Sequence, residues 1–189
     1  MSQRQKAGNT ISPDMREQED MRLGGIERTA VSADRHQEAW KQTLADAEAI
    51  ANAREADGWD TVVIHAIDTA PEAPDVGDTT RYGIVHVIPD NMAANLRQRT
   101  DELSFQEYDA YRATVDGRLF LVTELLAPAD DFALYVAGTF EIRHAQALYE
   151  TAAETETLYT HLQTLDETPV ASFVHDEYQK LVPSAFRQA

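Results

Sequence analysis

The sequence predicts an α+β fold, a mainly antiparallel sheet of about six to seven strands covered by helices, with a flexible N-terminal tail. Two observations predict this class: strand-like runs follow one another as hairpins in mid-chain, and helical periodicity recurs before, between and after them. The clearest hairpin signal is Asp116-Gly117 between the runs 108–115 and 118–126, because both turn positions need a positive φ.

The expected elements follow from periodicity and from turn residues. In chain order they are a helix at 34–57, strands at 61–67 and 82–88, a short helix after residue 91, strands at 108–115, 118–126 and 132–140, a helix at 142–154, strands at 158–165 and 170–174, and a terminal helix or turn at 177–186. Ser32 or Asp34 can cap the first helix, and Gly58 ends it. Its apolar face recurs at helical spacing, at Trp40, Leu44, Ala47 and Ala51.

Proline and glycine set the limits of the later elements. Residues 68–80 contain Pro71, Pro74 and Gly77, so we expect a loop there. Pro89 ends the second strand and is followed by residues that can cap the short helix. Pro169 lacks a backbone donor, which predicts that the last strand lies at the edge of the sheet.

The charged residues indicate a protein adapted to concentrated salt. The chain has 13 Arg and only 3 Lys against 33 Asp and Glu, and its net charge is -17. Such a surface repels itself in dilute buffer, whereas ~1 M salt shortens the Debye length to ~3 Å and screens the repulsion. An ordinary acidic protein that is poor in lysine is the alternative.

The charge is unevenly distributed along the chain, and this predicts a boundary near residue 30. Residues 1–30 carry five cations and five anions, so the whole net charge lies in residues 31–189. We expect residues 1–30 to be a flexible or disordered tail and residues 31–189 to be a single α+β domain. The alternative for the tail is a docking segment that becomes ordered on a partner and uses its few apolar residues, Met15, Met21, Leu23 and Ile26.

Several classes of function are disfavoured. The chain has no cysteine, which excludes disulfides, thiolate metal sites and cysteine nucleophiles. It has no apolar run of ~18 residues and no secretion signal, so we expect a cytoplasmic protein with no membrane partner. The absence of a basic patch argues against a nucleic acid partner. Phosphate-binding loops, nucleophile elbows and zinc-protease motifs are missing, so we expect no cofactor and no metal, and an enzyme is the less favoured class.

Three strand residues are nevertheless candidates for chemistry. His65 and His86 offer imidazoles, and Glu124 lies in the most apolar strand, where burial would disfavour its ionised form. Counting outwards from the turn places Glu124 across from Asp109. For Glu124 the alternative is a solvated carboxylate at a strand end. For the histidines the alternative is that the four on strands lie apart and share no site; they are His65, His86, His161 and His175.

Tyrosines on the strands are candidates for a ligand site or an interface, because each combines a large ring with a polar end. The candidates are Tyr108, Tyr111 and Tyr135, and the rim of an ordinary sheet is the alternative. Our first hypothesis is a non-catalytic protein-binding or interaction module that docks a protein partner or forms a homo-oligomer. The alternatives are a small-molecule-binding protein or enzyme that uses the strand-borne His and Glu residues, and a structural subunit of a larger assembly.

Four short stretches of the sequence carry a resemblance. They are Trp40 with Asp46-Ala47-Glu48-Ala49, then Gly58-Trp59-Asp60, Ile88-Pro89-Asp90-Asn91, and residues 108–120 around Tyr111-Arg112-Ala113. Together with Ser172-Phe173-Val174-His175 they resemble a family of small acidic haloarchaeal proteins of unknown function, over roughly residues 37–186. The resemblance implies an archaeal, salt-loving source and a single compact domain, and it supplies no activity and no site residue.

Overall fold

The computed structural model describes residues 13–74, 82–183 and 186. These residues contain three α-helices and eight strands. The helices are α1 (Pro13–Ala56), α2 (Asp90–Glu102) and α3 (Gln146–Thr155). The strands are β1 (Asp60–His65), β2 (Asp68–Glu72), β3 (Gly83–Val87), β4 (Glu107–Val115), β5 (Arg118–Ala127), β6 (Phe132–Glu141), β7 (Leu158–Gln163) and β8 (Pro169–His175). The protein is therefore α+β, as predicted.

The eight strands form two mixed sheets, so the prediction of one sheet of about six to seven strands is wrong, although four of the six strand pairs are antiparallel, as expected. Sheet A has the order β1-β6-β5-β4, and sheet B has the order β2-β3-β7-β8. Each sheet contains one parallel pair, β1 with β6 and β3 with β7, and its other pairs are antiparallel. Parallel pairing joins segments far apart in the chain, and no local sequence pattern marks it.

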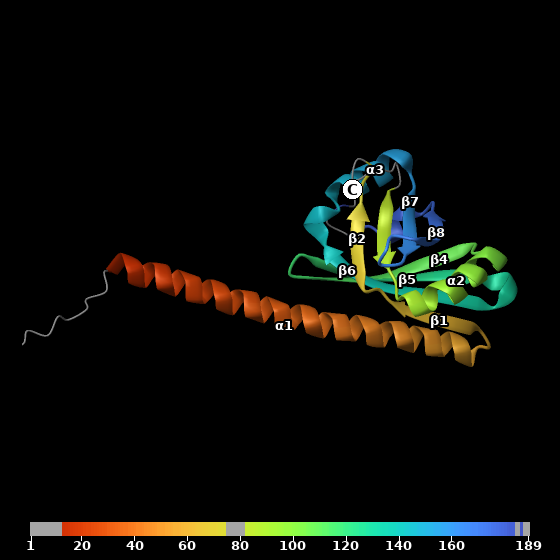
Figure 1. Cartoon of the computed structure of the whole chain (residues 1–189), viewed down its shortest axis with the longest axis horizontal. Coiled ribbons are helices and arrows are strands. Elements are labelled where there is room, and N and C mark those ends of the chain that lie inside the picture. Colours follow the sequence, from red (N-terminus) through yellow and green to blue (C-terminus); the bar gives the residue numbers. More distant parts are fainter. Residues whose placement is uncertain (1–12, 75–81, 184–185, 187–189) are drawn as a thin grey trace, which may run out of the picture.

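Sheet A lies between α1 and sheet B, and the strands of sheet B run across those of sheet A (Figure 1). The small residues Ala47 and Ala51 of α1 pack against the face of sheet A that carries Val122 and Tyr135. The opposite face of sheet A packs on sheet B through a second apolar cluster, whose members include Leu134, Val136, Leu162 and Phe173. The buried side chains of sheet A thus alternate between two layers, whereas none of the residues of the edge strand β4 is fully buried.

A glycine allows the two sheets to approach closely. Gly138 of β6 faces sheet B, and a Cβ atom at this position would lie 2.6 Å from Cε1 of His86. Thr69 of β2 would crowd the same atom. A larger side chain at position 138 would therefore push β2 and β3 away from β6.

The helix α1 begins at Pro13 and not at Ser32 or Asp34, so the predicted start is wrong, whereas its predicted end is correct. Gly58 follows the helix with a φ of 94°, which glycine adopts without strain. Figure 1 shows the C-terminal half of α1 lying along sheet A and the N-terminal half extending beyond the body. Residues 1–12 lie outside the described residues, and the flexibility of residues 1–30 stays a prediction.

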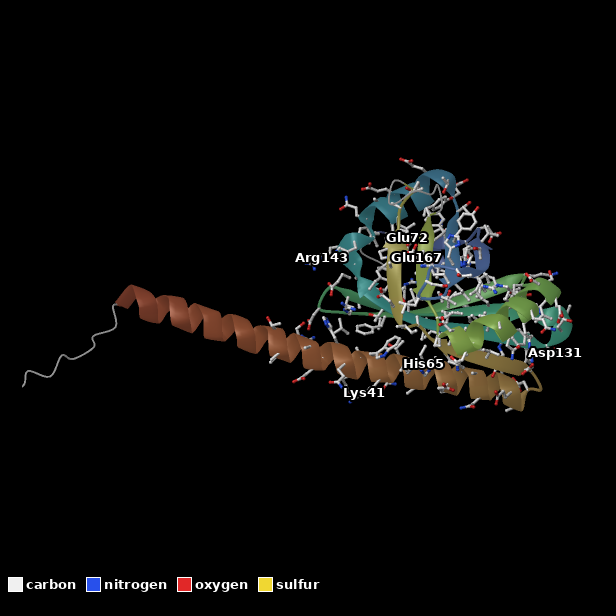
Figure 2. All side chains as sticks on the ribbon, viewed as in Figure 1. Lys41, His65, Glu72, Asp131, Arg143 and Glu167 are labelled. Atoms are coloured by element: carbon white, nitrogen blue, oxygen red, sulfur yellow. The ribbon has the colours of Figure 1, made fainter. Side chains whose placement is uncertain are left out.

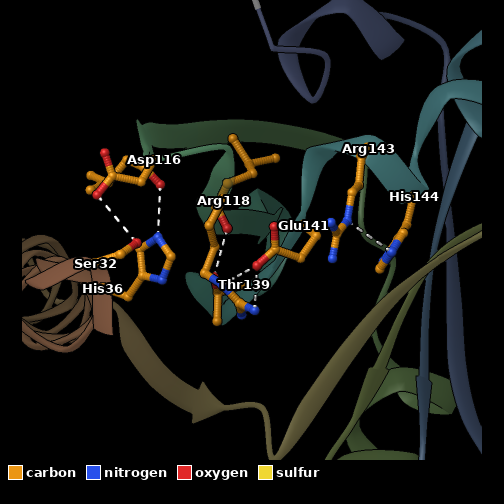
Figure 3. A network of polar contacts seen from close by, with 10 residues as sticks. Ser32, His36, Asp116, Arg118, Thr139, Glu141, Arg143 and His144 are labelled. Atoms are coloured by element: carbon orange, nitrogen blue, oxygen red, sulfur yellow. Dashed lines mark hydrogen bonds and ion pairs between the residues drawn. The ribbon is translucent and has the colours of Figure 1, made fainter. Parts of the chain in front are cut away.

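The β4–β5 hairpin holds α1 where the helix reaches the body (Figure 3). Asp116 and Gly117 form the predicted turn with φ values of 46° and 80°. Arg35 of α1 forms an ion pair with Asp116 at 2.8 Å, and Nε2 of His36 lies 3.1 Å from the carbonyl oxygen of Val115. Ser32 also donates a hydrogen bond to Asp116. These contacts fix α1 on sheet A from Ser32 onwards.

Two further predictions differ from the structure. The expected loop at 68–80 contains β2, because Pro71 is tolerated at the edge of sheet B. The expected helix at 142–154 is divided into a 3-10 turn at Ile142–His144 and α3. The terminal helix or turn expected at 177–186 contains a 3-10 turn at Tyr178–Lys180, in agreement with the prediction. The edge position of β8 agrees with the prediction from Pro169.

Candidate functional site

Glu124 is buried on the face of sheet A that α1 covers. Its exposed fraction is 2%, so it is not a solvated carboxylate at a strand end. The register places it opposite Asp109 of β4, as predicted, and opposite Tyr135 of β6. Two of the candidate tyrosines lie beside it, because Tyr111 is two residues from Asp109 on the same face of β4.

Three donors converge on the Glu124 carboxylate. Arg54 Nε donates to Oε1 at 3.0 Å, the Tyr135 hydroxyl donates to Oε1 at 2.8 Å, and the Tyr111 hydroxyl donates to Oε2 at 3.0 Å. We call these four residues the Glu124 cluster. Sequence reasoning found Glu124 and both tyrosines but missed Arg54, since only the packing of α1 on sheet A brings Arg54 to the strand.

The electrostatics of the Glu124 cluster follow from burial and from the carboxylate. Burial, and next the Glu124 charge, raise the pKa of Tyr111 to about 12. The same causes raise the pKa of Tyr135. Burial opposes the positive charge of Arg54, but the hydrogen bond and charge of Glu124 outweigh it and raise the pKa of Arg54. With both oxygens hydrogen-bonded, this carboxylate is suited to holding α1 on the sheet.

The candidate histidines do not join Glu124 around one cleft. His65 lies at the end of β1 beside α1 (Figure 2), is 45% exposed, and has Nε2 3.4 Å from Glu48. His86 is fully buried between the sheets, on the opposite side of sheet A from Glu124. Its Nδ1 lies 3.1 Å from Oγ1 of Thr69, and burial, with a smaller effect of His161, lowers its pKa to about 3. Side chains on opposite faces of one sheet, such as Glu124 and His86, cannot contact the same reacting atom.

A cavity of about 540 Å³ lies where the edges of the two sheets come together. Its lining consists mainly of two runs of consecutive residues, 103–108 leading into β4 and 170–176 along β8. β4 is the edge strand of sheet A, and β8 is the edge strand of sheet B. Thr100, Asp101 and Leu125 complete the lining. We call this cavity the edge groove.

The edge groove combines carboxylates with aromatic rings. Asp101, Glu107 and Asp176 line it, and one cation contacts the lining, since Nζ of Lys180 donates to the carbonyl oxygen of Tyr108 at 3.2 Å. The rings of Phe105 and Phe173 meet edge to face, with their centroids 5.1 Å apart. Its surface therefore offers negative charge next to apolar area.

Two buried polar atoms of the lining lack a hydrogen-bond partner among the described residues, the hydroxyl oxygen of Tyr108 and Nδ1 of His175. His175 is fully buried and stacks at a tilt on Tyr108, a candidate from the sequence, with ring centroids 4.3 Å apart. Its Nε2 lies 2.8 Å from Oγ1 of Thr160, whereas its Nδ1 has no hydrogen-bond partner among the described residues. Burial lowers the pKa of His175 to about 4, so the ring is neutral at neutral pH. Buried polar atoms without a partner are unusual, and Nε2 of His86 and Oγ1 of Thr123, which do not line the groove, are in the same condition.

Sequence reasoning did not find the edge groove. It identified Tyr108 and the edge position of β8 separately, but the two runs of the lining lie more than 60 residues apart in the chain. No spacing within the sequence indicates that they meet.

Comparisons with known proteins give a family and no activity. Residues 26–183 match a family of unknown function, DUF7529. No curated protein and no solved structure matches the chain. Within residues 13–74, 82–183 and 186, no group of three or more His, Asp and Glu side chains is placed to hold a metal ion. None of the helices in that part of the chain is long and apolar enough to cross a membrane.

Proposed function

Because the chain belongs to DUF7529, a family of unknown function, we propose its function from the edge groove: it is an interaction module that binds an extended segment of a partner protein. The observation that carries this proposal is the free edge of β8 beside the cavity. In the described part of the chain, β8 pairs with β7 on one side and with no strand on the other.

An open strand edge is a template for another strand. It presents a row of N–H and C=O groups, and an extended peptide that adds to it gains main-chain hydrogen bonds. Arg97 of α2 already donates to the carbonyl oxygen of Pro169 at 2.8 Å, which closes the start of β8. The groove continues along residues 170–176, and seven residues of strand extend over ~23 Å. A partner segment of about six residues fits that length.

The shape of the groove supports a peptide over a compact small molecule. Small-molecule sites are enclosed and mostly apolar, with a few polar groups that converge on one point. The edge groove instead follows two stretches of backbone and is open along its length. If a compact small molecule binds in the groove instead of a peptide, the proposal of a peptide-binding module is wrong.

The charges of the groove define the partner segment. Asp101, Glu107 and Asp176 favour Lys and Arg side chains, and the pair Phe105 and Phe173 favours an apolar residue. The segment is therefore basic with an interspersed apolar residue. At ~1 M salt the Debye length is ~3 Å, so only charge pairs in direct contact contribute there.

We test this proposal with labelled peptides of about ten residues that are basic, neutral or acidic, using fluorescence anisotropy at about 0.2 M and about 2 M KCl. The double variant Asp101→Lys and Glu107→Lys reverses two exposed carboxylates of the groove. We expect it to weaken binding of basic peptides about tenfold at the lower salt concentration. The matched control Glu154→Lys, on an exposed part of α3, leaves binding unchanged. The proposal is wrong if no peptide binds, or if the groove variant binds as tightly as the unmodified protein.

The setting that we propose for this module is the salt-rich cytoplasm of a salt-loving archaeon. The net charge of -17 and the scarcity of lysine support it. In that setting the main-chain hydrogen bonds and the apolar contacts supply most of the affinity, and the carboxylates select the partner at contact distance.

A further inference from the structure

We propose that residues 1–12 of a second copy of this chain bind in the edge groove. This inference rests on the proposed function, because it names the partner that the groove would bind. Three properties support residues 1–12 as the occupant: their charge, their freedom from proline, and the place where α1 delivers them.

Residues 1–12 are basic in an otherwise acidic chain. They contain Arg4 and Lys6 and no Asp or Glu, whereas the whole chain has a net charge of -17. Residues 178–189 are also free of acids, but Leu181, Val182 and Phe186 of that stretch pack on the body. Of these two acid-free stretches, residues 1–12 are the one that lies entirely outside the described residues.

The residue pattern of this stretch suits strand addition. No proline occurs before Pro13, so no backbone donor is missing from this stretch, and the alternate N–H groups that face β8 are able to pair with it. Arg4 and Lys6 are two residues apart and fall on one side of an extended segment. Both therefore face the same side of the added strand, and the lining of the groove offers carboxylates at Asp101, Glu107 and Asp176.

Residues 1–12 cannot reach the groove of their own chain. Pro13 lies 23 positions before His36, so this part of α1 extends over ~35 Å, and Figure 1 shows it leading away from the body. His36 lies beside Val115, and Tyr108 in the groove is a further ~24 Å along β4. Twelve fully extended residues span at most ~42 Å, and about six of them must lie within the groove. The ~20 Å that remains does not return the chain even to His36, so the acceptor is another copy.

The contact is head to tail, because the donor surface and the acceptor surface differ. Such an interface produces either closed rings or open chains, depending on the rotation between successive copies. Association is therefore expected to rise with concentration and to continue beyond a dimer unless a ring closes.

Two full-length variants test the inference by sedimentation velocity. The tail variant carries Arg4→Gln and Lys6→Gln, and the groove variant carries Asp101→Lys and Glu107→Lys. We expect the unmodified protein to self-associate, and each variant alone to associate about tenfold more weakly. An equimolar mixture is expected to stop at a 1:1 complex, because only the tail of the groove variant and the groove of the tail variant remain intact.

Peptide binding separates failure of this inference from failure of the proposed function. The probe is a synthetic peptide of residues 1–12, with a control peptide in which Gln replaces Arg4 and Lys6. If other basic peptides bind the groove but this peptide does not and the protein stays monomeric, the inference is wrong and the proposed function stands. If no basic peptide binds, both are wrong.

Discussion

The Glu124 cluster and the edge groove both place a buried polar side chain beside a tyrosine, and they differ in how far that side chain is satisfied. Glu124 accepts hydrogen bonds from Arg54, Tyr111 and Tyr135, and it is 2% exposed. His175 is fully buried, but one of its ring nitrogens has no partner among the described residues. A complete network stabilises the fold, whereas an incomplete one beside an open cavity is suited to binding.

The two sites also differ in their relation to solvent. Glu124 itself is 2% exposed beneath α1, whose last turns carry Arg54 across the carboxylate. The edge groove is bordered by exposed carboxylates that water and salt reach, such as Asp101 and Glu107. Acid, mutation and salt should therefore change the free energy of unfolding by different amounts through the two sites. Each of these changes tests the comparison.

Acid is expected to give the largest effect, through the buried histidines. Burial lowers the pKa of His86 to about 3 and that of His175 to about 4, so the unfolded chain takes up protons near its ordinary value of about 6.5 while the folded chain does not. Stability is therefore fully present above pH ~6.5 and falls as the pH decreases, by about 4 kcal/mol at pH ~5 for the two residues together.

Urea unfolding between pH ~7 and pH ~4.5 measures this loss. The variant His175→Gln should reduce the slope of stability against pH by about 1.4 kcal/mol per pH unit, since one proton fewer is taken up on unfolding. The control is His65→Gln, at a site that is 45% exposed, and it should leave the slope close to that of the unmodified protein. Equal slopes for all three proteins would show that His175 is not held neutral by its site.

Loss of the carboxylate from the Glu124 cluster is expected to rank second. Glu124→Gln removes the charged acceptor of three hydrogen bonds at a position that is 2% exposed, so we expect a loss of about 3 kcal/mol in the free energy of unfolding. The matched control Glu154→Gln on exposed α3 should change stability by less than about 0.5 kcal/mol. A loss at Glu124 no larger than that of the control would mean that the cluster does not hold α1.

These two sites also show what sequence reasoning can and cannot find. The Asp116-Gly117 turn set the register that placed Glu124 opposite Asp109, because a two-residue turn leaves no freedom in the pairing. The apolar strand made Glu124 a candidate, but the sequence left open whether its carboxylate is buried or solvated. Arg54 was not found, because the sequence of α1 does not show which of its cationic side chains contacts a strand of the sheet. The edge groove was not found either, because it depends on the packing of one sheet across another.

Salt is expected to have a moderate effect on the whole domain and a small effect on the Glu124 cluster. Raising KCl from about 0.2 M to about 2 M screens the repulsion of a chain with a net charge of -17, and we expect about 2 kcal/mol of added stability and a rise in Tm of about 4–8 °C. The loss caused by Glu124→Gln should stay the same at both concentrations, because a buried pair is little screened. A Tm that does not change with salt would contradict the proposed salt-rich setting.

Removal of one hydroxyl from the rim of the Glu124 cluster is expected to give the smallest effect. Tyr111 is 40% exposed and donates to Glu124 at 3.0 Å, so Tyr111→Phe should decrease stability by about 1 kcal/mol at neutral pH. Burial, and next Glu124, raise the pKa of Tyr111 to about 12, so the unfolded chain loses this proton first as the pH passes about 10. The hydroxyl therefore stabilises the fold below pH ~10, and its contribution is lost between pH ~10 and ~12. Unfolding curves of the two proteins should converge over that range, and curves that stay parallel would show that the phenol is not held protonated by the cluster.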